Sequence, residues 1–325
     1  MEDGSQRYDA LLVISFGGPE GMDDVIPFLE NVLRGRNVPR ERMLQVAQHY
    51  ELFGGVSPIN QQNRELIAAL QKELEEHAPN LPIYWGNRNW HPLLPDTVKQ
   101  MADDGIQNAL AFVTSGYSSY SSCRQYLQNI KDAQAAVGPT APRIEKLRAF
   151  YNHPLFIEAN VDHICEAIRQ LRAPHLVFTA HSIPESVAAN CDYAAQLEET
   201  GGVIARALNI VNWQVVYQSR SVTPGQPWLG PDVCDYLKHL RSVGVTEVVV
   251  APIGFVSDHM EVIYDLDVEA RQVADEIGMN LVRAKTAGTH PAFVKMIREL
   301  MVERINNLVP PKICEPTCCL VFLHA

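Results

Sequence analysis

Short apolar runs rich in β-branched residues alternate with helical patterns along almost the whole chain, and this alternation restricts the fold more than any other feature. The runs that predict strands are 8–16, 81–86, 108–114 and 144–151 in the first half, and 175–180, 211–218, 247–253 and 280–284 in the second. The helical patterns are at 23–33, 40–50, 62–77, 95–104, 154–172, 188–208, 230–243 and 291–308. Continuous apolar strands separated by helices are typical of parallel sheets covered on both faces. We therefore expect an α/β protein with two doubly wound sheets facing across a cleft.

The length of 325 residues favours two domains. A break at Asn152, His153 and Pro154 separates the two halves. We predict Rossmann-like domains over residues 1–152 and 153–309, followed by a cysteine-containing tail over residues 310–325. No repeat is detectable as sequence identity between the halves.

Composition excludes several functional classes. The net charge of −11 argues against nucleic acid as a partner. No apolar run approaches the 18 residues or so that a membrane span needs, and the acidic N-terminus lacks a secretory pattern. Seven cysteines are too few, and odd in number, for a disulfide scaffold. The sequence predicts a cytoplasmic protein.

The stretch at 246–269 joins a buried strand to a helix that is expected to start near Ser257 or Asp258. The carboxylates of Glu261, Asp265 and Glu269 are spaced by four residues, which places them along one face of an α-helix. A solvated acidic face is the simple interpretation. The row begins just after the end of a strand, however, where open α/β sheets bind ligands, so it could instead carry a cation or a proton.

His181 also follows the end of a predicted strand. Ser182 and Glu185 fit a capping box for the next helix, which leaves His181 at the expected cleft. A neutral imidazole there can accept a proton or bind a metal at pH 7, although a lone histidine is often only a packed side chain. Glu261 has an alternative structural role too, because Asp258 could cap the helix with Glu261 returning the bond.

Two further segments are unusual in composition. Residues 115–126 combine many hydroxyl side chains with three tyrosines, which fits the wall of a ligand cleft better than a flexible linker. Cys314, Cys318 and Cys319 fall within six residues of the tail. Thiols this close in a cytosolic protein suggest an iron–sulfur cluster or zinc, with one more thiolate from elsewhere, unless they belong to a frayed end.

Six motifs, taken together, resemble the ferrochelatase family. They are LLVISFGGP (11–19), FGGVSPI (53–59), AHSIP (180–184), QSR (218–220), PWLGP (227–231) and PIGFVSDHME (252–261). The resemblance covers residues 8–308 in the expected order. The segment SCRQY (122–126) and the cysteine tail are similar to the actinobacterial type.

The resemblance implies two chelatase-like domains around a porphyrin cleft and an enzyme, a lyase, that inserts Fe²⁺ with release of two pyrrole protons. His181 and Glu261 match the facing residues that would bind iron and accept protons. Asp265 and Glu269 match an acidic ridge that passes metal or protons along.

The resemblance also implies a set of porphyrin contacts: Ser15, Phe16, Arg34, Tyr50, Ser57, Tyr117, Tyr126 and Trp228. Two positions depart from other members. Phe16 stands where some have tyrosine, so axial ligation from there is excluded, and His49 stands where some have arginine, so propionate pairing must differ.

The expected substrate is coproporphyrin III, because the actinobacterial type implies it and the region at 46–57 is polar where membrane-associated relatives are apolar. The product would be coprohaem, passed to a downstream enzyme of haem synthesis by a monomeric protein. Protoporphyrin IX is the alternative substrate. Less favoured alternatives are a chelatase for another metal or tetrapyrrole and a non-catalytic haem or metal carrier.

In the relatives that carry a cluster, one internal and three C-terminal cysteines hold a [2Fe–2S] centre. Cys123 matches the internal position, and Cys314, Cys318 and Cys319 match the others. Such a cluster would have a structural or sensing role.

Overall fold

The structure is a computed structural model that describes residues 8–35, 38–220 and 226–308. The predicted tail domain, with Cys314, Cys318 and Cys319, lies outside the described residues. The described chain divides into two compact units. The first holds residues 8–114, Gln125–Arg148 and 297–308, and the second holds Ser115–Arg124 and residues 149–296. The predicted boundary after Asn152 stays a prediction.

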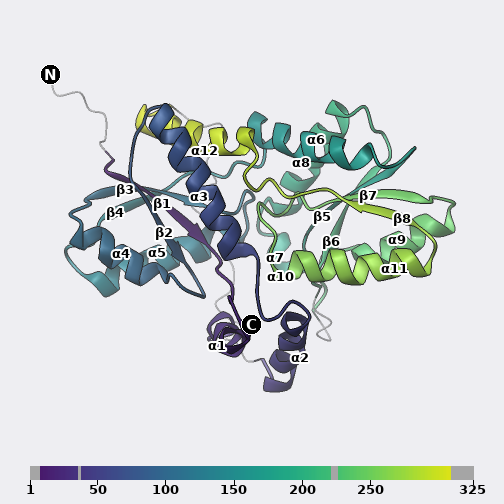
Figure 1. The fold of residues 1–325 in the computed structure, drawn as a ribbon, viewed down its shortest axis with the longest axis horizontal. Coiled ribbons are helices and arrows are strands. Elements are labelled where there is room, and N and C mark those ends of the chain that lie inside the picture. The colour runs from purple at the N-terminus through teal and green to yellow at the C-terminus, as the bar shows by residue number, and fades with distance from the viewer. Residues whose placement is uncertain (1–7, 36–37, 221–225, 309–325) are drawn as a thin grey trace. The chain divides into compact units, whose positions relative to one another are not determined.

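The first unit contains a four-stranded parallel sheet in the order β2-β1-β3-β4. Its strands are β1 (Ala10–Ser15), β2 (Ile83–Asn87), β3 (Asn108–Val113) and β4 (Arg143–Lys146). Its helices are α1 (Met22–Val32), α2 (Arg40–Glu51), α3 (Ile59–Glu76), α4 (Leu94–Asp103) and α5 (Gln125–Val137). The apolar faces of α4 and α5 pack on one face of this sheet (Figure 1) through residues such as Val98 and Ile130.

The second unit contains a four-stranded parallel sheet in the order β6-β5-β7-β8. Its strands are β5 (His175–His181), β6 (Trp213–Gln218), β7 (Glu247–Ala251) and β8 (Asn280–Arg283). Its helices are α6 (Pro154–Ile168), α7 (Glu185–Ala188), α8 (Tyr193–Ala207), α9 (Val233–Ser242), α10 (Met260–Val262) and α11 (Ala270–Glu276), with π-helices η1 (Tyr120–Arg124) and η2 (Ile263–Glu269). Helix α12 (Pro291–Ile305) belongs to the second unit up to Met296 and to the first from Ile297.

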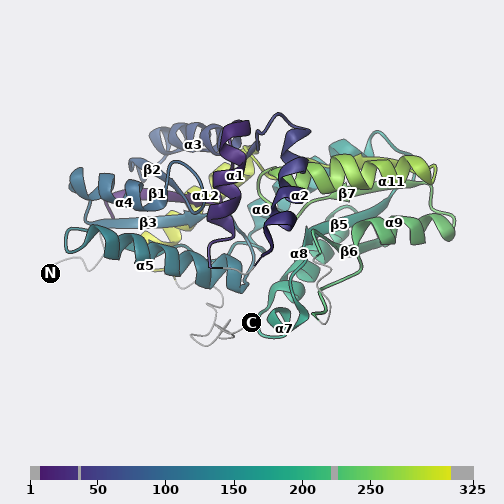
Figure 2. The same cartoon turned by 90° about the horizontal axis from the view of Figure 1, so that it is seen from below.

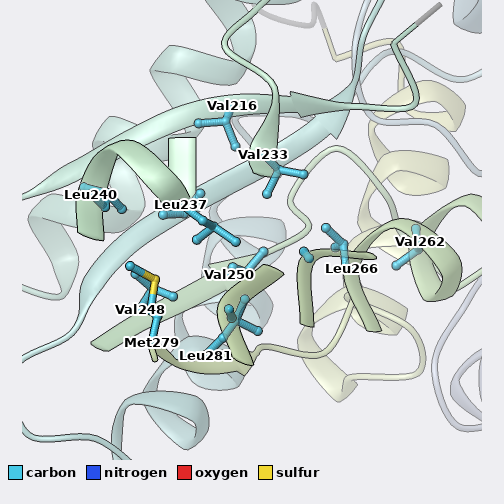
Figure 3. Packing of buried hydrophobic residues seen from close by; sticks show 13 residues of the cluster. Val216, Val233, Leu237, Leu240, Val248, Val250, Val262, Leu266, Met279 and Leu281 are labelled. Atoms are coloured by element: carbon cyan, nitrogen blue, oxygen red, sulfur yellow. The ribbon is translucent and has the colours of Figure 1, made fainter. Parts of the chain in front are cut away.

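The core of the second unit lies between its sheet and the helices α9 and α11 (Figure 3). Val177, Val216 and Val250 project from three neighbouring strands and are fully buried against Leu237 of α9 and Ala274 of α11. The opposite face is covered by α6 and α8, which lie on the other side of the sheet from α11 in Figure 1 and contact β7 and β6. Figure 2 shows the same elements from the side of α11. Burial on both faces explains why these strands are continuous apolar runs.

The two sheets have the same topology: in each, the second strand of the unit lies beside the first, and the third and fourth follow on the other side. The predicted α/β class with two parallel sheets is therefore confirmed. The repeat escapes detection as sequence identity because the topology depends on the alternation of apolar strands and amphipathic helices, not on particular side chains. In each sheet the order reverses between the first and third strands, which is where open α/β sheets bind ligands.

Several local predictions differ from the structure. In the segment 115–126, η1 occupies Tyr120–Arg124 and runs directly into α5, and neither helix was predicted. The role of this segment as a wall of a ligand cleft stays a prediction. The helical spacing of Tyr126, Ile130 and Ala133, all buried, is the signal that the hydroxyl-rich start of the segment hid. Strand β4 ends at Lys146, before the predicted end at Tyr151.

Both predicted capping boxes are wrong. The Ser182 hydroxyl donates to the Leu229 carbonyl oxygen at 2.7 Å, and Glu185 is the first residue of α7, whose N-cap is Pro184. Helix α10 begins at Met260 rather than near Ser257, and no side chain caps it. Asp258 is paired with Arg283 instead, at 3.0 Å. In both places a partner distant in sequence replaces the local backbone bond.

Candidate active site

His181 and Glu261 meet at the reversal point of the second sheet. His181 is the last residue of β5, and Glu261 lies in α10, which follows the adjacent strand β7. The imidazole Nε2 lies 3.6 Å from the Glu261 Oε2. Their side chains are 35% and 49% exposed, so both are open to solvent or to a ligand. The structure thus brings together the two residues that the sequence analysis paired.

The ring of His181 is oriented by its neighbours. Its Nδ1 contacts the backbone carbonyl oxygen of Ser182, and because a carbonyl can only accept, Nδ1 carries the proton. This tautomer leaves a lone pair on Nε2, facing Glu261. The hydroxyl of the buried Tyr193 donates to the carbonyl oxygen of His181 at 3.0 Å and fixes the backbone. The imidazole is therefore prepared to bind a cation or to accept a proton.

His259 lies beside the same carboxylate, with its Nδ1 4.0 Å from the Glu261 Oε2. Its ring packs edge-on against Phe255, with the ring centroids 5.0 Å apart. Burial lowers the pKa of His259, while the Glu261 charge opposes this shift. A neutral imidazole at this position is the result that burial favours.

Asp265 and Glu269 follow Glu261 on η2, which is a π-helix and not the α-helix that the sequence analysis expected. The wider π turn changes the angle between successive carboxylates, but they remain close enough to influence one another, since the charges of Glu261 and Glu269 both raise the pKa of Asp265. π-Helical turns are rare and are frequently found at functional sites.

Asp265 is the most perturbed carboxyl group of this segment. Burial is the main cause that raises its pKa to about 7, with the neighbouring carboxylates adding to the shift. The Ser219 hydroxyl donates to its Oδ2, and Gln218 Nε2 lies 3.4 Å from the same oxygen, and both oppose the rise. Burial also raises the pKa of Glu269, and the negative charge of Asp232 raises it further. Asp265 can therefore hold or release a proton near neutral pH.

Four residues that shape this site are not among the predicted site residues: Tyr193, Gln218, Ser219 and Arg283. Gln218 donates from Nε2 to the Glu261 carbonyl oxygen at 3.0 Å as well as facing Asp265. Ser219 has a φ of 58°, a left-handed backbone that a serine rarely adopts. Arg283 binds Asp258 and Asp267, on either side of α10. The QSR motif was a visible signal for Gln218 and Ser219, whereas no motif marked Tyr193 or Arg283.

Four predicted porphyrin contacts in the first unit lie at the carboxyl end of β1, on α2 or in the loop after α2. Ser15 ends β1 and its hydroxyl accepts from Thr114 Oγ1 at 3.1 Å. Phe16 and Tyr50 both pack edge-on against Phe28, at 6.2 and 6.0 Å between ring centroids. Ser57 is buried, and its backbone N–H donates to the Pro19 carbonyl at 2.9 Å.

The remaining predicted porphyrin contacts have different environments. Arg34 is exposed and donates to Asn31, and Tyr126 is buried in the first unit. In the second unit, Tyr117 is buried with its hydroxyl donating to the Ile253 carbonyl at 3.0 Å. Trp228 has a buried indole N–H that finds no acceptor among the described residues.

Cys123 lies in η1, is partly exposed and forms no disulfide within the described chain. Over residues 8–35, 38–220 and 226–308, no group of three or more histidine, cysteine or acidic side chains is arranged to hold a metal ion. None of the helices in the described part of the chain is long and apolar enough to cross a bilayer.

The two parallel sheets define an α/β protein with the fold of solved chelatases. Solved structures with the same fold include SirB from Bacillus subtilis with Fe³⁺, with a TM-score of 0.59 and 10% identity over 93% of this chain and 97% of that one. CbiX, the terminal enzyme of sirohaem biosynthesis in denitrifying bacteria, has a TM-score of 0.54 and 12% identity over 90% and 98%. Identities this low show the fold alone.

The particular family comes from the sequence comparisons. The ferrochelatase family model matches residues 8–305, and the chain belongs to this family. The ferrochelatase of Rhodopirellula baltica is 53% identical over 96% of this chain and 93% of its own length. The coproporphyrin III ferrochelatases of Streptomyces coelicolor and Nocardia farcinica are 49% and 50% identical, over 92% and 94% of this chain and 86% and 90% of their own. The predicted family and the enzyme class, a metal chelatase, are confirmed.

Proposed function

We propose that this protein inserts Fe²⁺ into coproporphyrin III to give coprohaem in haem synthesis. The observation that carries the proposal is the separation of 3.6 Å between His181 Nε2 and Glu261 Oε2 at the reversal point of the second sheet. The identity of about half the residues with curated coproporphyrin III ferrochelatases supports the choice of substrate.

His181 and Glu261 are assigned to the Fe²⁺ substrate. Imidazole nitrogen and carboxylate oxygen both bind ferrous iron, and metal–ligand bonds of about 2.0–2.2 Å permit two ligand atoms separated by roughly 3–4 Å. The protonated Nδ1, held by the Ser182 carbonyl, leaves Nε2 as the coordinating atom. Both side chains are exposed enough to exchange their hydration for the metal.

Insertion also releases two pyrrole protons, which need acceptors. His181 and Glu261 can take protons once iron has left them for the ring. Asp265 is the next group along η2, and with a pKa raised to about 7 by burial it binds and releases a proton at little cost. We assign Asp265 and Glu269 to the transfer of protons or metal away from the reacting pair.

The porphyrin contacts are assigned to Ser15, Phe16, Arg34, Tyr50, Ser57, Tyr117, Tyr126 and Trp228. The unsatisfied indole N–H of Trp228 supports its assignment, because a buried donor without an acceptor gains from a ligand oxygen. Phe16 supplies an apolar ring and no axial ligand.

We also propose a [2Fe–2S] cluster held by Cys123 with Cys314, Cys318 and Cys319. The unbridged, partly exposed thiol of Cys123 fits the role of one ligand. The cluster would cross-link η1 to the tail and so supply a structural or sensing element.

We further propose a cytoplasmic monomer that passes coprohaem to a downstream enzyme of haem synthesis.

The test is iron insertion by anaerobically purified protein with coproporphyrin III and protoporphyrin IX side by side. A clear preference in kcat/KM for coproporphyrin III supports the proposal. A preference for protoporphyrin IX would assign protohaem as the direct product, and failure with both would overturn the proposal.

A further inference from the structure

The partly buried arginines of this chain are usually paired with carboxylates. In an acidic protein this is expected, because a charge removed from water needs a counter-charge. The pairs are Arg148–Glu303 at 2.8 Å, Arg283–Asp258 at 3.0 Å, Arg298–Glu73 at 2.8 Å and Arg304–Glu145.

Arg88 is an exception. It directly follows β2, and within the described chain no carboxylate lies in ion-pair contact with it. Its guanidinium carbon lies 4.8 Å from the ring centroid of Tyr126 and 5.6 Å from that of Phe16. Its Nε is buried and finds no hydrogen-bond acceptor. The side chain is thus a half-buried cation held by aromatic rings.

The surrounding backbone fixes this arrangement. The Arg88 N–H donates to the Ser15 carbonyl at 3.0 Å, which ties the end of β2 to the end of β1. The backbone N–H and the Nδ2 of Asn89 both donate to the Phe16 carbonyl, at 3.1 and 3.2 Å. Phe16 and Arg88 are therefore held side by side, before any ligand arrives.

Aromatic rings stabilise a guanidinium through its faces, whereas its N–H donors point outward in its plane. A carboxylate matches two parallel donors of that plane, and the pairing is strongest where water is excluded. The place is also suitable, since the carboxyl ends of parallel strands are where open α/β sheets bind ligands.

We propose that Arg88 binds a carboxylate group of the tetrapyrrole substrate and contributes to selection of porphyrins by their acidic side chains. The proposal rests on the proposed function, since it assumes a porphyrin substrate, and it adds a residue that the motifs did not mark. The rings of Phe16 and Tyr126 then have a second task, which is to hold the guanidinium in position for the carboxylate.

The test measures porphyrin binding without metal, by fluorescence titration of the full-length protein with coproporphyrin III. Arg88→Met is expected to raise Kd about 10- to 100-fold, the effect of losing a charge-assisted bidentate pair. Coproporphyrin III tetramethyl ester, added in detergent, has no carboxylates, so wild type and Arg88→Met are expected to bind it equally. Arg64→Met is the matched control, because Arg64 also lies over an aromatic ring, that of Trp85, but already has a carboxylate partner in Glu20.

Each outcome has a separate meaning. A wild-type protein that binds no porphyrin contradicts the proposed function itself, before any variant is measured. A folded Arg88→Met with the wild-type Kd, or with an equal loss for the acid and the ester, overturns the role of Arg88 alone. If circular dichroism shows that Arg88→Met is unfolded, the same titrations are made with Arg88→Gln, whose side chain is neutral but planar and polar. The same outcomes then support or overturn the role of Arg88.

Discussion

The Nε2 of His181 lies 3.6 Å from the Oε2 of Glu261 although the two residues are 80 positions apart in sequence. The sheet sets this separation, since β5 and β7 are adjacent and Ala251, the last residue of β7, pairs with Phe178, three residues before His181. The loop after β7 then passes tightly over β5. The Gly254 N–H donates to the Thr179 carbonyl at 3.0 Å, and a Cβ at Gly254 would lie 2.5 Å from that of Ala180. Glycine at this position therefore helps to bring Glu261 to the imidazole.

His181→Ala is expected to abolish iron insertion while leaving the protein folded. The side chain is partly buried, and its loss should lower the free energy of unfolding by about 1 kcal/mol, the typical cost of a point mutation, which leaves the protein folded. Insertion should fall by at least about 100-fold, as expected for loss of a residue that binds the metal or accepts a proton. Continuous spectroscopy of Fe²⁺ insertion measures this, with His77→Ala, at an exposed helix end, as the control. Turnover near that of wild type would refute the assignment.

Asp265→Asn is expected to alter the pH dependence of stability. Burial raises the pKa of Asp265 from an ordinary 3.8 to about 7, so its contribution to stability is fully present below pH 3.8 and is lost as pH rises through 7. The asparagine of the variant does not ionise, so the variant does not lose stability in this way as the pH rises. Relative to wild type, the variant should gain free energy of unfolding between about pH 4 and 7, by at most roughly 4 kcal/mol, and the difference should be level above pH 8. Urea unfolding at several pH values measures this, and a pH-independent difference would contradict the raised pKa.

Ser219→Ala is expected to shift the pH profile of insertion. The Ser219 hydroxyl donates to the Asp265 carboxylate and lowers the pKa of Asp265 against the dominant effect of burial. Without the hydroxyl this pKa rises further, so Asp265 ionises only at higher pH. If Asp265 accepts protons during insertion, the acidic limb of the kcat profile moves to higher pH. The same limb should be absent in Asp265→Asn. A limb at the same pH in wild type and Ser219→Ala would exclude Asp265 as the group responsible.

The periodicity of the sequence was sufficient for the fold class, and it placed His181 and the acidic row of Glu261 separately at strand ends. The pairing of His181 with Glu261 came from the resemblance to ferrochelatases. Apolar strands alternating with helices fix a parallel α/β topology, and strand ends at the reversal point bring specific residues together. The alternation of strands and helices is a local signal that is read from periodicity, whereas the pairing was not. The two four-stranded sheets have the same topology because each half of the chain has this alternation of strands and helices.

What could not be predicted depends on contacts between distant residues. The π-helical form of η2 changes which i-to-i+n bonds form, and no local pattern marks it. The pairing of Arg283 with Asp258, 25 residues away, cannot be read from spacing, and it replaced the expected capping role of Asp258. The burial of Asp265 likewise arises from tertiary packing, so its raised pKa required the structure.

Cys123→Ser is expected to remove the visible absorbance of the proposed cluster from anaerobically prepared protein. A [2Fe–2S] centre needs four ligands, and a hydroxyl is a much poorer one than a thiolate. Cys165→Ser is the matched control, because Cys165 is also a partly exposed free cysteine, but on α6. An unchanged spectrum in Cys123→Ser would eliminate the four-cysteine assignment, and loss in Cys165→Ser would require a different ligand set.

Arg283→Met is expected to destabilise the second unit and to weaken insertion together. The guanidinium donates to both Asp258 oxygens at 3.1 and 3.0 Å and to both Asp267 oxygens at 2.6 and 2.9 Å, so it holds the two sides of α10. Removing it takes away the positive charge that Asp258 and Asp267 share, at a cost of about 3–5 kcal/mol.

The control is Lys99→Met, which breaks an exposed pair with Asp103 and should cost less than about 1 kcal/mol. A second variant separates charge from packing. If the cost of Arg283→Met comes from the stranded carboxylates, adding Asp258→Asn and Asp267→Asn must recover part of the lost stability, because the neutral amides need no counter-charge. Insertion need not recover, since the bridge across α10 is still missing and Glu261 is less firmly held. A triple variant less stable than Arg283→Met would mean that the arginine acts by packing its alkyl chain and not by pairing with the two carboxylates.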